Sequence, residues 1–107
     1  MRQSSGKIQG DPVWWVKCGD TLVGSLSSPE SDQPWIVCHF EPSDGWESLS
    51  SLFEVQAEAR RTGFPEDKVW AIKAVRELHL ELHPVIDGEV LKPMLIYIEG
   101  AEARFRL

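Results

Sequence analysis

Three side chains with the donor atoms of a zinc site, His79, Glu81 and His83, occupy every second position of one segment. Residues two apart point to the same side of a β-strand, so a strand would place all three on one face. Cys38-His39 on a neighbouring strand could supply a further ligand. A solvated sheet face explains the same spacing without a metal. Because a structural zinc site needs four convergent ligands, we expect no metal here.

A second group of side chains, His39, Glu41 and Asp44, has the chemistry needed for acid–base catalysis. It falls where a strand ends and a helix begins, a common position for functional side chains. The alternative is structural, with Asp44 capping the helix and Glu41 on the surface. The chain contains no glycine-rich phosphate loop and no G-x-S-x-G, H-E-x-x-H or C-x-x-C motif. The sequence therefore predicts a protein that is not an enzyme, has no catalytic residues and needs no cofactor.

Tryptophan is frequent in this chain, with five in 107 residues, and one adjacent pair is informative. Neighbouring residues of a strand point to opposite faces, so Trp14 and Trp15 cannot both enter the core. The outward ring either packs under the N-terminal residues or forms a contact surface, since Trp is enriched in binding hot spots. We predict Trp14, Trp15, His39 and Tyr97 as binding residues.

The strands that would position these side chains follow from β-branched and aromatic runs between turn signals. We expect strands at Pro12–Cys18, Thr21–Leu26 and Pro34–Pro42, with a loop over Ser27–Gln33. Alternation predicts a fourth strand over 78–83, with its leucines toward the helices and its histidines outward. A final hairpin is expected at Met94–Ile98 and Ala103–Leu107.

Two helices are expected between the third and fourth strands. Apolar residues recur at helical spacing after Asp44, which forms a pattern similar to a capping box with Glu47. A second helix follows Phe64-Pro65. The order β-β-β-α-α-β-β-β predicts a single α+β domain over 11–107, a mostly antiparallel sheet of about five to six strands with two helices on one face. Residues 1–10 are expected to form a disordered leader.

The charge balance limits the partners. The chain has 11 Lys and Arg against 17 Asp and Glu, a formal net charge of −6. Nucleic-acid binding needs a basic footprint, so we expect no nucleic-acid partner. No apolar run reaches the roughly 20 residues that span a bilayer, and no signal peptide is visible, so we expect no membrane partner and a cytoplasmic location. Cys18 and Cys38 would then be reduced, although a disulfide between neighbouring strands stays an alternative.

These observations favour a small, acidic, soluble protein that acts by protein–protein interaction through an edge strand or the outward face of its sheet. The alternative is a small-molecule binding protein with an aromatic pocket between sheet and helices. The first hairpin is expected at an edge of the sheet, where unpaired backbone groups would favour a homodimer. Lys17 is its only basic residue. The expected partner is therefore another protein or a second copy of this chain.

Overall fold

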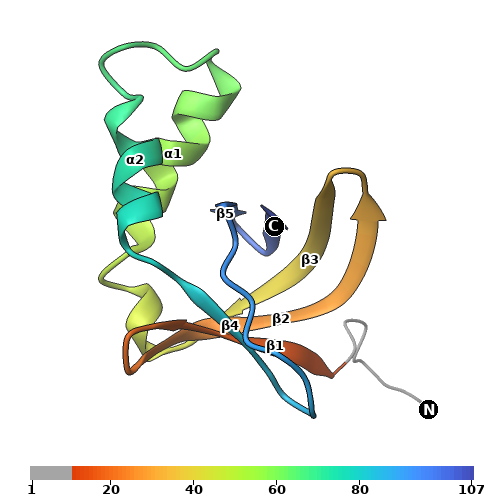
Figure 1. The fold of residues 1–107 in the computed structure, drawn as a ribbon. Coiled ribbons are helices and arrows are strands. Elements are labelled where there is room, and N and C mark those ends of the chain that lie inside the picture. Colours follow the sequence, from red (N-terminus) through yellow and green to blue (C-terminus); the bar gives the residue numbers. More distant parts are fainter. Residues whose placement is uncertain (1–10) are drawn as a thin grey trace, which may run out of the picture.

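The computed structural model describes residues 11–107, and the predicted leader at 1–10 lies outside the described residues. One antiparallel sheet of 6 strands has the order β4-β1-β2-β3-β6-β5 (Figure 1). The strands are β1 (Pro12–Cys18), β2 (Thr21–Asp32), β3 (Trp35–Pro42), β4 (Glu81–Pro84), β5 (Leu95–Glu99) and β6 (Glu102–Arg106). The helices are a 3-10 turn η1 (Asp44–Trp46), α1 (Ser50–Arg61) and α2 (Trp70–Glu77). The predicted α+β class and element order are confirmed.

The sheet is strongly curled, and its two ends approach each other (Figure 1). On one side, Leu82 in β4 exchanges two backbone hydrogen bonds with Leu91, each 2.9 Å long. Leu91 belongs to the segment that leads into β5, so the chain itself covers the edge of β4. Across the concave face, the rings of Trp14 and Phe105 meet edge to face at 5.5 Å. The curl therefore encloses one core between strands that are not neighbours in the sheet.

The core combines the concave face of the sheet with one side of each helix. Aromatic rings join the layers, because Trp46 lies 4.9 Å from Phe40 and 5.2 Å from Phe53. Gly24 is required beside them, since a Cβ there would lie 2.5 Å from the Phe40 ring. The other large buried apolar side chains are Val16, Val23, Leu26, Val75, Leu80, Leu82, Ile96, Ile98 and Phe105.

β2 is longer than expected. The predicted loop Ser27–Gln33 is wrong over most of its length, because β2 continues to Asp32 and pairs with β3 as far as Trp35. A register shift between Ser27 and Glu30 interrupts the pairing around the proline. Proline is tolerated in strands at such irregular positions, so the sequence signal for a loop was a signal for a bulge.

The first helix begins later than expected. Asp44 starts the short η1 turn, and α1 follows only at Ser50, without a side-chain cap at Ser43 or Leu49. The predicted capping box therefore does not form. Among residues 11–107, no helix combines the length and apolar character needed to cross a membrane.

The fourth strand is also shorter than expected, beginning at Glu81 and not at residue 78. Leu78 ends α2, and His79 turns the chain with a positive φ of 53°. Leu80 and Leu82 are buried as predicted, whereas Leu78 is only partly buried against the core. The helical hydrogen bonds thus extend into the segment whose alternation predicted a strand.

The first hairpin does not lie at an edge. β1 pairs with β2 on one side and with β4 on the other, so its backbone groups are taken up inside the sheet. The premise of edge-to-edge pairing through β1 is wrong, because β4 covers this strand. β4 comes more than 60 residues later in the chain and could not be placed from sequence order. Self-association by another surface stays a prediction.

The two cysteines are free. They lie in β1 and β3, which β2 separates, so they are not on neighbouring strands. The Cys18 thiol donates to the carbonyl oxygen of Leu78 at 3.7 Å. Burial raises the pKa of the Cys38 thiol to about 12, which keeps it protonated and unreactive at neutral pH.

Candidate functional site

The predicted binding residues divide between the two faces of the sheet. Trp14 shares the concave side with Val16 and packs against the core. Trp15, His39 and Tyr97 occupy the opposite, convex face, at positions paired with residues such as Ser25, Glu102 and Arg104, respectively. β2, β3 and β6 separate Trp15 from Tyr97. The structure therefore does not gather the four residues into one site.

Tyr97 in β5 is the centre of a small cluster on the convex face. The Trp35 ring lies 5.7 Å away at 55°, and the Arg60 guanidinium lies 5.2 Å from the Tyr97 ring centroid. Together with their surroundings they leave Tyr97 only 7% exposed. Burial raises the pKa of Tyr97, and the positive charges of Arg60 and Arg76 oppose that rise. Tyr97 is therefore a neutral phenol at physiological pH.

All five arginines of the described chain lie around β5. Arg61 pairs with Glu99 of β5, Arg104 pairs with Glu102, and the other three arginines form no ion pair with a described residue. The Nε atoms of Arg104 and Arg106 are buried without a hydrogen-bond partner. The arginines are Arg60 and Arg61 in α1, Arg76 in α2, and Arg104 and Arg106 in β6.

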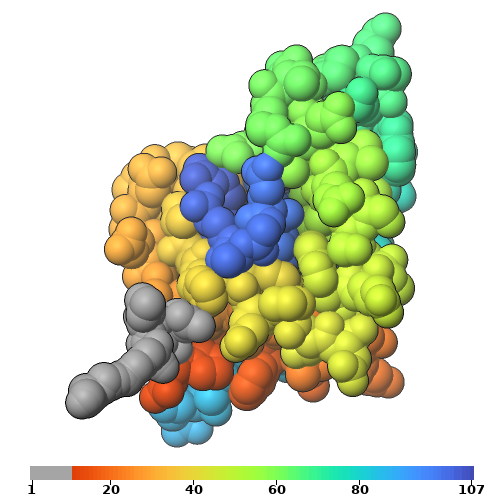
Figure 2. Space-filling model, turned by 180° about the vertical axis from the view of Figure 1, so that it is seen from behind, coloured from red at the N-terminus to blue at the C-terminus, as the bar shows by residue number. Residues whose placement is uncertain are grey.

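We use the name β5 surface for Trp35, Arg60, Tyr97, Arg104 and Arg106. Seen from behind, the C-terminal hairpin (blue) reaches the surface between the β2–β3 hairpin and α1 (Figure 2). The sequence analysis did not select any of these arginines as a binding residue. Their alternation in β6, where Arg104 and Arg106 flank a buried Phe105, was the available signal.

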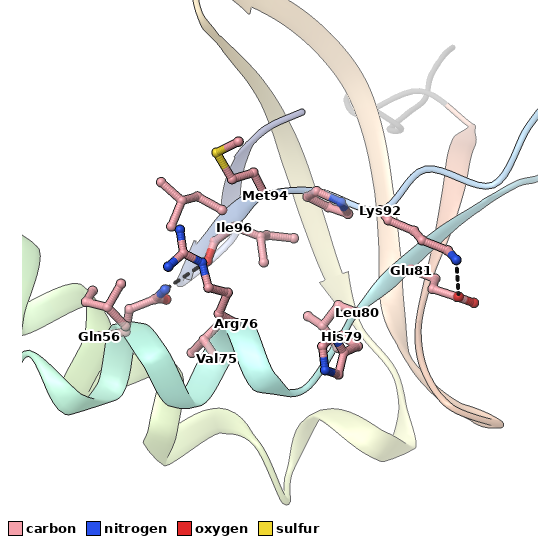
Figure 3. A pocket seen from close by; sticks show the side chains of 12 residues that line it. Gln56, Val75, Arg76, His79, Leu80, Glu81, Lys92, Met94 and Ile96 are labelled. Carbon is pink, nitrogen blue, oxygen red and sulfur yellow. Dashed lines mark hydrogen bonds and ion pairs between the residues drawn. The ribbon is translucent and has the colours of Figure 1, made fainter.

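A pocket of about 450 Å³ lies between α2 and the segments that enter β4 and β5 (Figure 3). It is in the layer where an aromatic pocket was expected, but its walls are aliphatic and charged. None of the four predicted binding residues lines it. Its lining includes Gln56, Val75, Arg76, His79, Leu80, Glu81, Lys92, Met94 and Ile96.

Gln56 is the most deeply buried polar side chain of this pocket, with 1% exposure. Its Nε2 donates to the carbonyl oxygen of Ile96 at 3.0 Å, which covers part of the free edge of β5. Its Oε1 is buried and has no hydrogen-bond partner among residues 11–107. Sequence analysis missed Gln56, although it continues the apolar stripe through Leu49 and Phe53 at helical spacing. A polar residue inside an apolar stripe was the available signal.

Trp14 lines an open groove of about 580 Å³ on another part of the molecule. Val13, Val85 and Ile86 also line it, and Ile86 is 82% exposed. The groove joins the start of β1 to the turn after β4. It is an exposed apolar feature at the start of the described chain.

Among residues 11–107, no three His, Cys, Asp or Glu side chains are gathered as a metal ion would need. His83 and Glu81 are 3.0 Å apart in β4, but His79 lies in the turn before the strand. β1 and β2 separate Cys38 from β4.

No known protein family, curated protein or solved structure matches this chain. The β5 surface and the pocket beside α2 are therefore candidate sites on the basis of their own geometry.

Proposed function

We propose that this protein acts without enzymatic activity, by binding an acidic segment of another protein at the β5 surface. The observation that carries the proposal is the cluster of Trp35, Tyr97 and Arg60 on the convex face of the sheet. Trp, Tyr and Arg are the residue types most enriched in interaction hot spots. They are rigid or planar groups, which lose little conformational freedom on binding.

Charge complementarity supports an acidic partner. The protein carries a net charge of −6, yet all its described arginines surround one strand. Arg60 and Arg106 form no ion pair with a described residue, so their guanidinium groups are available to carboxylates. Arginine binds carboxylates through two parallel hydrogen bonds, which gives such contacts both strength and direction.

A protein segment fits this surface better than a nucleic acid. Glu99 and Glu102 neutralise Arg61 and Arg104, and acidic residues of β2 lie beside Trp35. A continuous run of phosphates would meet these carboxylates, whereas a peptide can place its few acidic groups on Arg60 and Arg106 alone.

Selection from a random peptide display library would test the proposal. Peptides enriched on the wild-type protein should contain an excess of Asp and Glu. Arg60→Glu should weaken a selected peptide by at least about tenfold, the effect of losing one hot-spot arginine. Lys73→Glu is the matched control, because Lys73 is exposed in α2 and forms no ion pair with any of residues 11–107.

The proposal fails if the selected peptides carry no acidic excess or if Lys73→Glu weakens them as much as Arg60→Glu. Circular dichroism of both variants checks that the fold is intact. Tighter binding of a single-stranded oligonucleotide than of any acidic peptide would assign the surface to nucleic acid. Protection of the β5 surface only by a second copy of the chain would assign it to a homodimer.

A cytoplasmic location belongs to the same proposal. The free thiols of Cys18 and Cys38 support it, since cytosolic cysteines are normally reduced. The second function expected from the sequence, small-molecule binding, would use a different part of the molecule, because no member of the β5 surface lines the pocket beside α2.

A further inference from the structure

The amide of Gln56 is only half satisfied. Its nitrogen is bonded to the Ile96 carbonyl oxygen, but its buried Oε1 meets no donor among residues 11–107. Most buried polar atoms in proteins have a partner, because a buried acceptor without a donor is costly. Since Gln56 lines the pocket, a molecule held there can bring the missing donor.

Arg76 supplies the second polar group of the pocket. It forms no ion pair with a described residue, and it lies in α2 among the lining residues. Figure 3 draws its guanidinium and the Gln56 amide toward one end, and Lys92 with Glu81 toward the other. Lys92 Nζ lies 4.0 Å from Glu81 Oε2, so the charges of these two side chains offset each other. The free positive charge is therefore at the Gln56 end, where it favours a carboxylate.

Apart from His79, the rest of the lining is apolar. Val75 and Leu80 are buried on one side of the pocket, Met94 comes from the segment entering β5, and Ile96 lies in β5 itself. The volume of about 450 Å³ is within the range of small-molecule sites, which combine apolar walls with a few polar groups. An apolar body of a few carbon atoms fits these walls.

We propose that this pocket binds a small organic acid with an aliphatic body and a hydroxyl or N–H group next to its carboxylate. The carboxylate pairs with Arg76, the adjacent donor bonds to Oε1 of Gln56, and the body packs on Val75 and Leu80. The site shares no residue with the β5 surface, so each proposal can fail without the other.

Three probes of similar shape separate these contributions: 2-hydroxy-4-methylpentanoate, 4-methylpentanoate and 4-methylpentan-1-ol. Each is titrated into the isotope-labelled full chain while backbone amide NMR signals are followed. The signals that shift should belong to residues 75–81 and 92–96. The hydroxy acid should bind about threefold or more tighter than the plain acid, and both acids about tenfold tighter than the alcohol.

Variants assign each preference to its residue. Arg76→Gln should weaken both acids about tenfold and leave the alcohol unchanged. Lys73→Gln is the matched control on the same helix, because Lys73 is exposed and does not line the pocket. Gln56→Met should abolish the advantage of the hydroxy acid over the plain acid. If that variant does not fold, the wild-type preferences and Arg76→Gln decide the question.

Three results would overturn the proposal. One is the absence of shifts in the pocket signals with either acid up to about 10 mM, well above a millimolar dissociation constant. Another is equal binding of the alcohol and the acids, which would leave no role for Arg76. The last is an equal loss of acid binding in Lys73→Gln and Arg76→Gln.

Discussion

The two edges of the sheet are covered in different ways. At β4, backbone covers backbone, because Leu82 and Leu91 satisfy each other with two hydrogen bonds. At β5, a helix covers the strand, and one side chain, Gln56, bonds to the Ile96 carbonyl oxygen. The first arrangement pairs the N–H and the C=O group of both leucines. The second leaves Gln56 Oε1 without a partner and the pocket beside it.

The difference shows how an exposed edge can become a site. An unpaired strand edge invites pairing with another chain, so both edges need a cover. A paired backbone segment fills the space along an edge, whereas a helix contacts it only through side chains of differing length. At β5 those side chains include Gln56 and, farther round, Arg60. The polar groups available for binding are therefore at the edge that a helix covers.

The largest expected effect concerns the β4 edge. The hydrogen bonds at this edge are made by the backbone, so a substitution does not remove them directly. We therefore expect the stability of this edge to depend on the apolar side chain packed beneath them. Leu82 is fully buried, so Leu82→Ala should lower the free energy of unfolding by about 2–5 kcal/mol. Urea denaturation measures this, with Leu107→Ala as control, since Leu107 is 59% exposed. A loss below about 0.5 kcal/mol, typical of surface sites, would show that this edge does not depend on its packing.

A smaller effect is expected at the β5 edge. Gln56→Ala removes the Nε2 donor to the Ile96 carbonyl oxygen and leaves that oxygen without a side-chain partner among residues 11–107. The expected cost is about 1–3 kcal/mol, the range for a buried group that loses its partner. Glu54→Ala, on the exposed side of the same helix, should change stability by less than about 0.5 kcal/mol. Equal effects of the two substitutions would contradict the assignment of Gln56 as the cover of this edge.

The sequence was sufficient for the fold because local patterns determined it. Strand and turn signals placed all six strands and the helical pair, and the predicted α+β order is confirmed. What it could not provide was the partner of each strand. That β4 covers β1 depends on a contact between segments more than 60 residues apart, which no local pattern specifies. For this reason the sequence analysis wrongly placed β1 at an edge of the sheet.

The candidate sites were harder to predict for the same reason. Tyr97 was selected as a lone aromatic residue, but its Arg60 neighbour comes from another element. Gln56 and Arg76 meet at the pocket only because α1 and α2 stand side by side (Figure 1). The separation of Trp14 from Trp15 was predictable, because it follows from the alternation of a strand alone.

Positive φ angles after each of the two helices give a third prediction. Gly63, after α1, has a φ of 84°, and His79, at the rim of the pocket, has a φ of 53°. Gly63→Ala should cost about 1–2 kcal/mol, because only glycine adopts positive φ without strain. No atom lies within 4 Å of a Cβ placed there, so crowding adds nothing. Thermal unfolding measures the loss.

His79→Gly is the opposite substitution. It should relieve strain and raise stability by at most about 1 kcal/mol, since glycine also gains freedom in the unfolded chain. A loss of stability would show that the His79 side chain makes a contribution larger than its backbone strain.

The smallest effect is a shift in one titration at β5. Tyr97 is the only tyrosine, so the phenolate absorbance of the folded protein reports on it alone. Burial raises its pKa, so phenolate should form above the usual value of about 10. A folded-state pKa above the unfolded value means that the associated stability is complete below about pH 10 and is lost as pH rises through the folded-state pKa. Arg76 lowers this pKa, so Arg76→Gln should raise it further, whereas Lys73→Gln should leave it unchanged. Phenolate formation at or below the usual pH would mean that water reaches the ring. In that case α1 would not exclude water from this part of β5.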